Sequence, residues 1–155
     1  MVVRRFAESD AGTVSRMIRT AMDISNRKDY PDEIMDALIL RETPKYVLEQ
    51  ACRTHMYVAL DGEKIIGSGA IGPLRDREDE SGLFTVFVLP EYQRKGVGRK
   101  IMEALEQDEY FIRAKRIEIR ASITGVPFYL RMGYHYRDGI SEPDGDLLLR
   151  LEKNR

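Results

Sequence analysis

Apolar and polar positions alternate along the first half of the chain in a way that predicts one strand, three helices and a hairpin. The helices show apolar residues at helical spacing and are preceded by capping residues or proline. The hairpin is predicted by the turn dipeptide Asp61-Gly62 between two apolar segments. The predicted segments are a strand at Val2 to Phe6, helices starting at Ser9 or Asp10, at Pro31 and at Thr43-Pro44, and strands at His55 to Leu60 and Lys64 to Ile71.

The second half begins with the charged stretch Arg75 to Glu80, which is predicted to be a surface loop. The short apolar run Leu83 to Leu89 then predicts a buried strand, and Val97, Ile101 and Leu105 recur at helical spacing after it. The remaining predicted segments are a strand at Arg116 to Ala121, a short helix at Val126 to Arg131, and a terminal hairpin of Tyr134 to Arg137 with Asp146 to Glu152.

The order of these segments predicts the fold class. It is β-α-α-α-β-β-β-α-β-α-β-β, with most strands joined by hairpins and two joined through helices. We expect an α+β protein with a mixed, mostly antiparallel, twisted sheet of six to seven strands and helices on both faces. The 155 residues suffice for one domain, and we expect residues 1–155 to form it.

Composition excludes several classes of protein. A net charge of −1 argues against a nucleic-acid binder that depends on a broad basic surface. We find no apolar run long enough for a membrane span and no signal-peptide core, and the only cysteine, Cys52, excludes an internal disulfide. We therefore expect a cytoplasmic protein.

Cys52 lies three residues before His55, but the second histidine, His135, is distant, so no zinc site is expected.

Two glycines, Gly96 and Gly98, lie where the apolar strand ends and the next helix begins. A helix N-terminus exposes unpaired N–H groups and partial positive charge, so it suits an anion. Four cations at the same place, Arg94, Lys95, Arg99 and Lys100, would repel one another and the helix dipole without an anion. The sequence therefore predicts a phosphate site. It is neither a Walker A loop nor a Rossmann fingerprint, because the required lysine pattern and third glycine are absent.

The segment Gln93-Arg94-Lys95-Gly96-Val97-Gly98 resembles the Gln/Arg-x-x-Gly-x-Gly/Ala loop of the GNAT superfamily of acyl-CoA-dependent N-acetyltransferases. About thirty residues later, Phe128-Tyr129-Leu130-Arg131-Met132-Gly133-Tyr134 resembles that family's Phe-Tyr-x-x-x-Gly-Phe/Tyr pattern. Ser122 stands where the family commonly has asparagine, and Gly125 where it commonly has alanine. Segment order agrees throughout, so the resemblance covers nearly the whole chain and implies a three-layer α/β/α fold.

The resemblance implies that acetyl-CoA is the acyl donor and that no metal is needed. It assigns the pantetheine arm to backbone groups of Phe87 and Val88, and Ser122 to the coenzyme site. It assigns the pyrophosphate to the backbone amides of the loop, which are those of Arg94, Lys95, Gly96, Val97, Gly98 and Arg99.

Acetyl transfer to an amine needs an acid and a base. The leaving thiolate must take a proton. The resemblance places Tyr129 near the sulfur as the general acid that donates it. The alternative for Tyr129 is an ordinary core aromatic residue. The amine must lose its proton, yet Gly82 stands where some relatives carry a glutamate. We expect deprotonation through water, held by Ser81 or Thr85 and ending at Glu80. A solvated loop charge is the alternative for Glu80.

Three functions remain open from the sequence. The first is an N-acetyltransferase acting on a primary amine of a small molecule or a protein. The second is a non-catalytic acyl-CoA-binding module, favoured by the glycine at the usual base position, and the third is a binder of another phosphate-bearing ligand. Met22, Tyr30 and Met35 are candidates to line an acceptor pocket or to pack in the core. A homodimer is possible through an exposed sheet edge.

Overall fold

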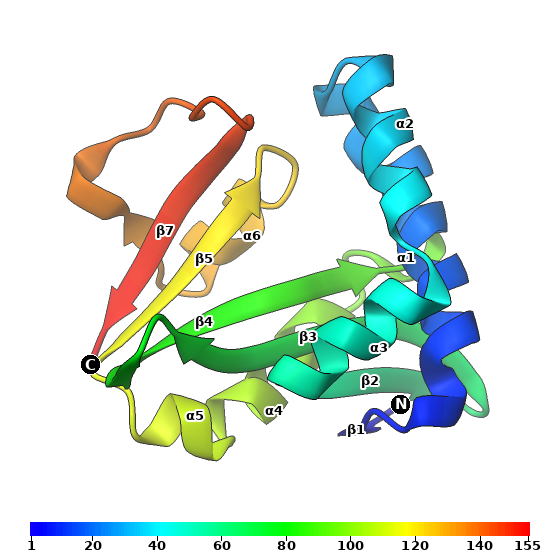
Figure 1. The fold of residues 1–155 in the computed structure, drawn as a ribbon, viewed down its shortest axis with the longest axis horizontal. Helices are drawn as coiled ribbons and strands as arrows, with labels where there is room; N and C mark the ends of the chain where they lie inside the picture. Colours follow the sequence, from blue (N-terminus) through cyan, green and yellow to red (C-terminus); the bar gives the residue numbers. More distant parts are fainter.

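The computed structural model describes all residues, 1–155, and its centre is one seven-stranded sheet (Figure 1). The strands are β1 (Val2–Arg5), β2 (His55–Asp61), β3 (Lys64–Leu74), β4 (Arg77–Val88), β5 (Arg116–Ser122), β6 (His135–Tyr136) and β7 (Leu148–Asn154). Their order across the sheet is β1-β2-β3-β4-β5-β7-β6. Every neighbouring pair is antiparallel except β4 and β5, which are parallel. A parallel pair requires a crossover connection, and a helix supplies it.

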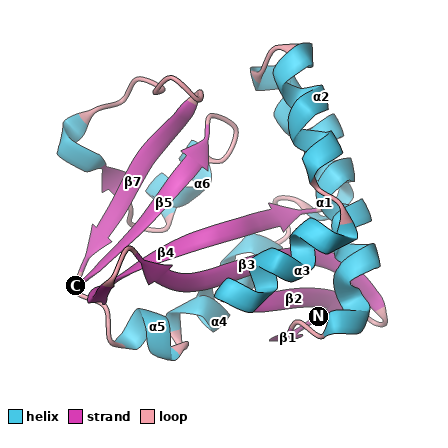
Figure 2. Ribbon diagram, in the orientation of Figure 1, coloured by secondary structure: helices cyan, strands magenta, loops and turns pink.

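Helices cover both faces of the sheet (Figure 2). They are α1 (Ala11–Ile24), α2 (Asp32–Arg41), α3 (Pro44–Arg53), α4 (Val97–Glu106), α5 (Glu109–Ile112) and α6 (Val126–Arg131), with a 3₁₀ turn η2 (Asn26–Asp29) between α1 and α2. Gly69 and Gly72 lie on opposite faces of β3. Gly69 faces Ile101 of α4, whereas Gly72 faces Thr54 at the end of α3. This arrangement confirms the predicted α+β fold with a mixed sheet between helical layers.

None of the helices combines the length and the apolar character that crossing a membrane would require.

The local sequence explains where the helices begin and which sides they bury. The hydroxyl of Thr43 accepts a hydrogen bond from the N–H of Tyr46 (3.1 Å), and Pro44 fills the first position of α3. In α4, Ile101 and Leu105 are fully buried on one side, as their spacing predicts. Packing of such apolar stripes onto the sheet stabilises helices that are too short to be stable alone.

Several boundaries differ from the sequence-based prediction. The predicted loop from Arg75 to Glu80 is wrong, because β4 already begins at Arg77 and only Arg75 and Asp76 form the turn. Arg77 pairs with Asp79 and Glu80 within the strand, and Glu80 also accepts a hydrogen bond from Arg116 of β5, a contact that no local pattern reveals. The single helical turn α5 was not predicted. The final hairpin is shorter at its start than expected: β6 has two residues and β7 begins at Leu148.

Candidate active site

The parallel strands β4 and β5 separate after a short paired section. They are paired only from Glu80 to Leu83 on β4 and from Arg116 to Ile119 on β5. Beyond Leu83, β4 continues to pair with β3 alone, so its side facing β5 has no strand partner (Figure 1). We call this open region the fork. Main-chain groups on this side of β4 have no strand partner and can hydrogen-bond an extended ligand arm, in the manner of an added strand; the Val88 carbonyl already accepts one bond, from Gln93.

A β-bulge marks the start of the fork on β4. The pairing register shifts between Ser68 and Ala70 of β3, and Thr85 has a positive φ of 49°. This conformation is unusual for a β-branched residue and is found where the surroundings impose it. The buried hydroxyl of Ser68 donates to the carbonyl of Thr85 (2.7 Å), which fixes the bulge. The Thr85 hydroxyl is buried without a hydrogen-bond partner in the protein.

The predicted phosphate loop follows directly from the end of β4. The N–H groups of six consecutive residues, Arg94 to Arg99, donate no hydrogen bond to any protein acceptor. Gly96 has a φ of 84° and open space around its α-carbon, so the backbone is accessible there. The Gln93 side chain holds the loop in place, donating to the Val88 carbonyl (3.0 Å) and the Ser25 hydroxyl (2.9 Å). The loop therefore presents a row of free donors at the N-terminus of α4.

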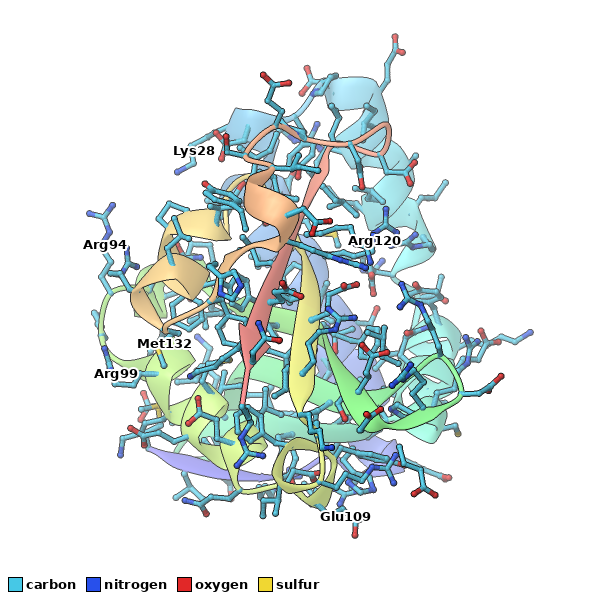
Figure 3. The ribbon with its side chains drawn as sticks, turned by 90° about the vertical axis from the view of Figure 1, so that its left-hand side faces the viewer. Lys28, Arg94, Arg99, Glu109, Arg120 and Met132 are labelled. Carbon is cyan, nitrogen blue, oxygen red and sulfur yellow. The ribbon has the colours of Figure 1, made fainter.

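Exposed cations surround these free donors. Figure 3 shows Arg94 and Arg99 at one edge of the molecule, pointing away from the sheet. Lys95 and Lys100 are also exposed. The carboxylate in this segment, that of Glu91, pairs with Lys64 on the β2–β3 hairpin instead (3.6 Å). An uncompensated group of cations beside free N–H groups is an electrostatic match for a diphosphate.

Tyr129 lies on α6, on the far side of the fork from β4. Its side chain is buried, and its ring packs edge-on against those of Phe128 (5.2 Å between centroids) and Tyr134 (6.0 Å). Burial first, and the neighbouring Tyr134 second, raise the pKa of Tyr129 well above the usual value of 10. The phenol therefore stays protonated across the physiological range and can act only as a donor of its proton.

Ser122, Phe87 and Val88 line the two arms of the fork. Phe87 and Val88 are half-buried residues in the section of β4 that pairs only with β3. Ser122 ends β5, where its hydroxyl accepts a hydrogen bond from the N–H of Gly125 (3.0 Å) and shapes the turn before α6. Its hydroxyl hydrogen remains free to donate, because this contact uses only an oxygen lone pair.

Glu80 lies at the opposite, closed end of the fork. Arg116 donates a 2.6 Å hydrogen bond to it, and Arg77 lies within 3.3 Å. These contacts, led by the bond from Arg116, lower the pKa of the Glu80 carboxyl. The eight residue steps from Glu80 to Val88 correspond to roughly 26 Å of strand. Glu80 is thus part of an ion-pair network, distant along β4 from the phosphate loop.

A buried carboxylate near Glu80 and the pair Cys52 and His55 make contacts typical of structural residues. Glu118 is almost fully buried and accepts hydrogen bonds from Arg116, Arg137 and Arg150. Cys52 is exposed, while His55 hydrogen-bonds the buried carboxylate of Asp108 (2.9 Å). No group of three or more His, Cys, Asp or Glu side chains is arranged to hold a metal ion.

Comparison with known proteins supplies the family. The family model described as "Acetyltransferase (GNAT) domain" matches residues 26–154. No sequence among the curated proteins matches the chain significantly.

Three solved structures illustrate the similarity of fold. The PaiA N-acetyltransferase of Thermoplasma acidophilum, in complex with coenzyme A, has a TM-score of 0.84 at 17% identity, covering 99% of this chain and 98% of that one. An aminoglycoside 6′-N-acetyltransferase complexed with coenzyme A has a TM-score of 0.72 at 12% identity, covering 99% and 97%. The ribosomal-protein-alanine N-acetyltransferase of Brucella melitensis has a TM-score of 0.69 at 16% identity, covering 100% of both chains. At such low identities the similarity concerns the fold.

Proposed function

Because this chain belongs to the GNAT acetyltransferase family and is an acyltransferase, we propose that it transfers the acetyl group of acetyl-CoA directly to a primary amine within a ternary complex. The observation that carries the proposal is the row of six free N–H groups from Arg94 to Arg99. Such a row at a helix N-terminus, surrounded by cations, is matched to the pyrophosphate of coenzyme A.

The free side of β4 suits the pantetheine arm, which carries amide groups and needs an extended path. Main-chain groups of Phe87 and Val88 lie between the phosphate loop and the bulge, so they would bind this arm. Ser122 lies across the fork, with a hydroxyl hydrogen still free to donate. When bound, acetyl-CoA supplies the activated acyl group; the chain supplies binding, orientation and protons.

Tyr129 is proposed as the general acid. A leaving thiolate needs a proton, and the Tyr129 phenol is protonated throughout the physiological pH range. Burial also excludes water from the neighbourhood of the proton transfer, which strengthens the interaction between phenol and thiolate. The alternative, a purely structural core tyrosine, predicts unaltered turnover when the hydroxyl is removed.

The amine is proposed to lose its proton to water in the fork rather than to a dedicated carboxylate. Gly82 occupies a buried position on β4 and has no side chain that could act as a base. The ion pair with Arg116 lowers the pKa of Glu80, which makes that carboxylate a weaker base than an unperturbed one. Its contacts favour an anchoring role for Glu80. The unpartnered Thr85 hydroxyl is a candidate to hold the water.

The acceptor is proposed to be a primary amine, on a small molecule or a protein. Relatives of this fold carry names with very different acceptors, an aminoglycoside in one and a ribosomal-protein alanine in another. The fold therefore does not select the acceptor, and residues around the fork must do so.

Two measurements test the proposal. Acetyl-CoA should raise the melting temperature of the protein, whereas ATP and NAD should not, because only the first has a pantetheine arm for the fork. Release of free thiol from acetyl-CoA should then depend on an added primary amine. Equal stabilisation by all three ligands would indicate a general phosphate binder. Specific stabilisation without thiol release across a broad amine panel would indicate a binding module.

A further inference from the structure

The helix α2 carries more apolar side chains than the rest of the chain covers. Five of its ten residues are large and apolar, and because successive residues turn by about 100°, the five are spread around the helix. A helix that is apolar on all sides is normally buried. In α2, however, only Met35 is buried, whereas Ile34 is 38% and Leu40 81% exposed. This helix therefore has an apolar surface without a partner in its own chain.

The exposed side of α2 forms a groove with α1. The two helices pack against each other at one side of the sheet (Figure 1), and α1 turns Val14, Ile18 and Ala21 into the core. The groove lies on the opposite side of α1, away from the sheet, and has a volume of about 530 Å³. We call it the outer groove and define it by the residues Arg16, Arg19, Ile24, Asp36, Ile39 and Leu40. Ile24 is 56% exposed and adds to the apolar surface of Leu40.

One end of the outer groove has an excess of negative charge. Arg27, in the turn between the helices, pairs with Asp23 of α1 and with Asp32 and Asp36 of α2, at 2.8 to 3.0 Å. Three carboxylates thus share one guanidinium, which leaves two negative charges without a partner. All three carboxylates are on exposed residues, so they are available to further cations.

The other end of the outer groove carries cations without a partner. Arg16 and Arg19 form no ion pair in the chain, and the side chain of Arg16 makes only a 3.3 Å contact with the Thr13 hydroxyl. At a rise of about 1.5 Å per residue, they lie about 10 and 6 Å along α1 from Asp23. Two unpaired cations therefore lie at one end of the groove and two unpaired negative charges at the other, with apolar side chains beside them.

A second copy of the chain is the partner that fits both ends. Related by a two-fold axis across the groove, the copy places its basic end on the acidic end of the first, and its acidic end on the basic end. Such an interface is isologous, because the same patch serves both subunits. A uniformly acidic or uniformly basic partner would be attracted at one end and repelled at the other. The net charge of −1 adds little repulsion between two copies.

We propose that the outer groove is the interface of a two-fold homodimer, with Ile24 and Leu40 as its apolar contacts. This surface differs from the sheet edge considered from the sequence, and the proposal does not depend on acetyl transfer. The 14 residues of α1 span about 21 Å, and two helices side by side are about 20 Å wide, so each copy contributes about 400 Å² in projection. Interfaces of this size form weak, reversible complexes, so we expect a dissociation constant on the order of 10 µM.

Sedimentation equilibrium between about 1 and 200 µM tests the proposal with Leu40→Ser, which removes the most exposed apolar side chain of the outer groove. The matched control is Ile112→Ser on α5, which removes an apolar side chain that is also mostly exposed (61%) but lies outside the groove. Both positions are on the surface, so neither change should alter folding. Melting curves at about 2 µM, where wild type is mostly monomeric, check this.

We expect Leu40→Ser to weaken dimerisation by about tenfold or more, and Ile112→Ser to change it by less than about twofold. Raising the salt concentration from about 50 to 500 mM should weaken the wild-type dimer by about fivefold or more, because exposed charge pairs are screened.

An exchange of charges tests the two-fold arrangement itself. The acidic variant is Arg16→Glu with Arg19→Glu, and the basic variant is Asp23→Lys with Asp36→Lys. Each variant has two like-charged ends and should stay monomeric alone, whereas an equimolar mixture should form mixed dimers. Adding Leu40→Ser to both should abolish the mixed dimer, which a general attraction between oppositely charged chains would not predict. The salt dependence of wild type serves if the basic variant, which removes two partners of Arg27, does not fold.

Three results would overturn the proposal. A wild-type chain that is monomeric at about 200 µM would leave the outer groove to a different partner. A dimer that Leu40→Ser leaves intact would lie on another surface, such as the sheet edge. A dimer that Leu40→Ser weakens, but that neither salt nor the exchange of charges affects, would contradict the pairing of basic and acidic ends.

Discussion

The backbone of Gly98 lies against the ring of Phe128: a β-carbon added to Gly98 would be 2.9 Å from Cε1 of the phenylalanine. The glycine is therefore required by packing between α4 and α6, in addition to any approach of a ligand. Gly96 differs, because its surroundings are open and its positive φ is what demands glycine. The contact joins the phosphate loop to the helix that carries Tyr129.

Gly98→Ala should disturb both partners of this contact. Overpacking costs about 1–3 kcal/mol, and the displaced α6 should lower kcat as well as acetyl-CoA affinity. Phe128→Leu offers a smaller, more flexible neighbour, so the double variant should recover part of the loss, as a double-mutant cycle would measure. Additive effects in the two single variants would contradict the coupling. Gly96→Ala should show no such recovery with Phe128→Leu.

Tyr129→Phe tests the general acid. We expect kcat to fall by about 10²-fold, because a positioned proton donor contributes at least that much, with acetyl-CoA affinity unchanged. Burial raises the pKa of the phenol, so wild-type activity should show no loss from ionisation of Tyr129 below pH 10. Single-turnover rates with a chosen amine, and calorimetry with acetyl-CoA, provide the two measurements. Turnover equal to wild type would remove Tyr129 from the mechanism.

Glu80→Gln separates an anchoring carboxylate from a base. Loss of the charged partner of Arg116 should destabilise the protein by about 1–2 kcal/mol at pH 7. The pKa of Glu80 is lowered in the folded state, so its contribution is present above the unfolded pKa of about 4.5 and is lost as pH falls through the folded value. Urea unfolding at pH 7 and pH 4 should therefore show a difference that shrinks in acid. A changed rate-versus-pH curve at unchanged stability would instead identify Glu80 as the base.

Glu42→Gln should have the opposite pH dependence. This carboxyl group, between α2 and α3, is buried, and one of its oxygens has no hydrogen-bond partner. Burial raises its pKa, with a smaller opposing effect of Arg41. The folded state then binds more protons than the unfolded state, so stability falls as pH rises above about 4.5. Glu42→Gln should raise the melting temperature at pH 8 and alter it little at pH 4. The same shift at both pH values would contradict this account.

The sequence identified most elements because their signals are local. The apolar spacing of Ile101 and Leu105 predicts the buried side of α4, and Thr43-Pro44 predicts the start of α3. The phosphate loop could also be predicted from the sequence, because glycines and cations between a strand and a helix favour an anion site. The roles assigned to its residues and to Tyr129 remain predictions that the proposed variants test.

Tertiary structure decided those features that depend on contacts between residues distant in the sequence. The residues from Arg77 to Glu80 resemble a solvated loop until Arg116 is placed beside Glu80 in the neighbouring strand. The bulge at Thr85 is likewise hidden, because threonine itself favours a regular strand.

Tyr30 is the clearest case of this division, because its hydroxyl donates to the Leu147 carbonyl and accepts from the Ile123 N–H. These two hydrogen bonds join it to residues 117 and 93 positions later, and its local sequence does not indicate either partner. The sequence by itself determined most of the elements and predicted the phosphate loop, because periodicity, capping and charge act over a few residues. Only the fold decided where β4 and β5 separate and which carboxylates are paired, because those contacts exist only once the distant segments have packed together.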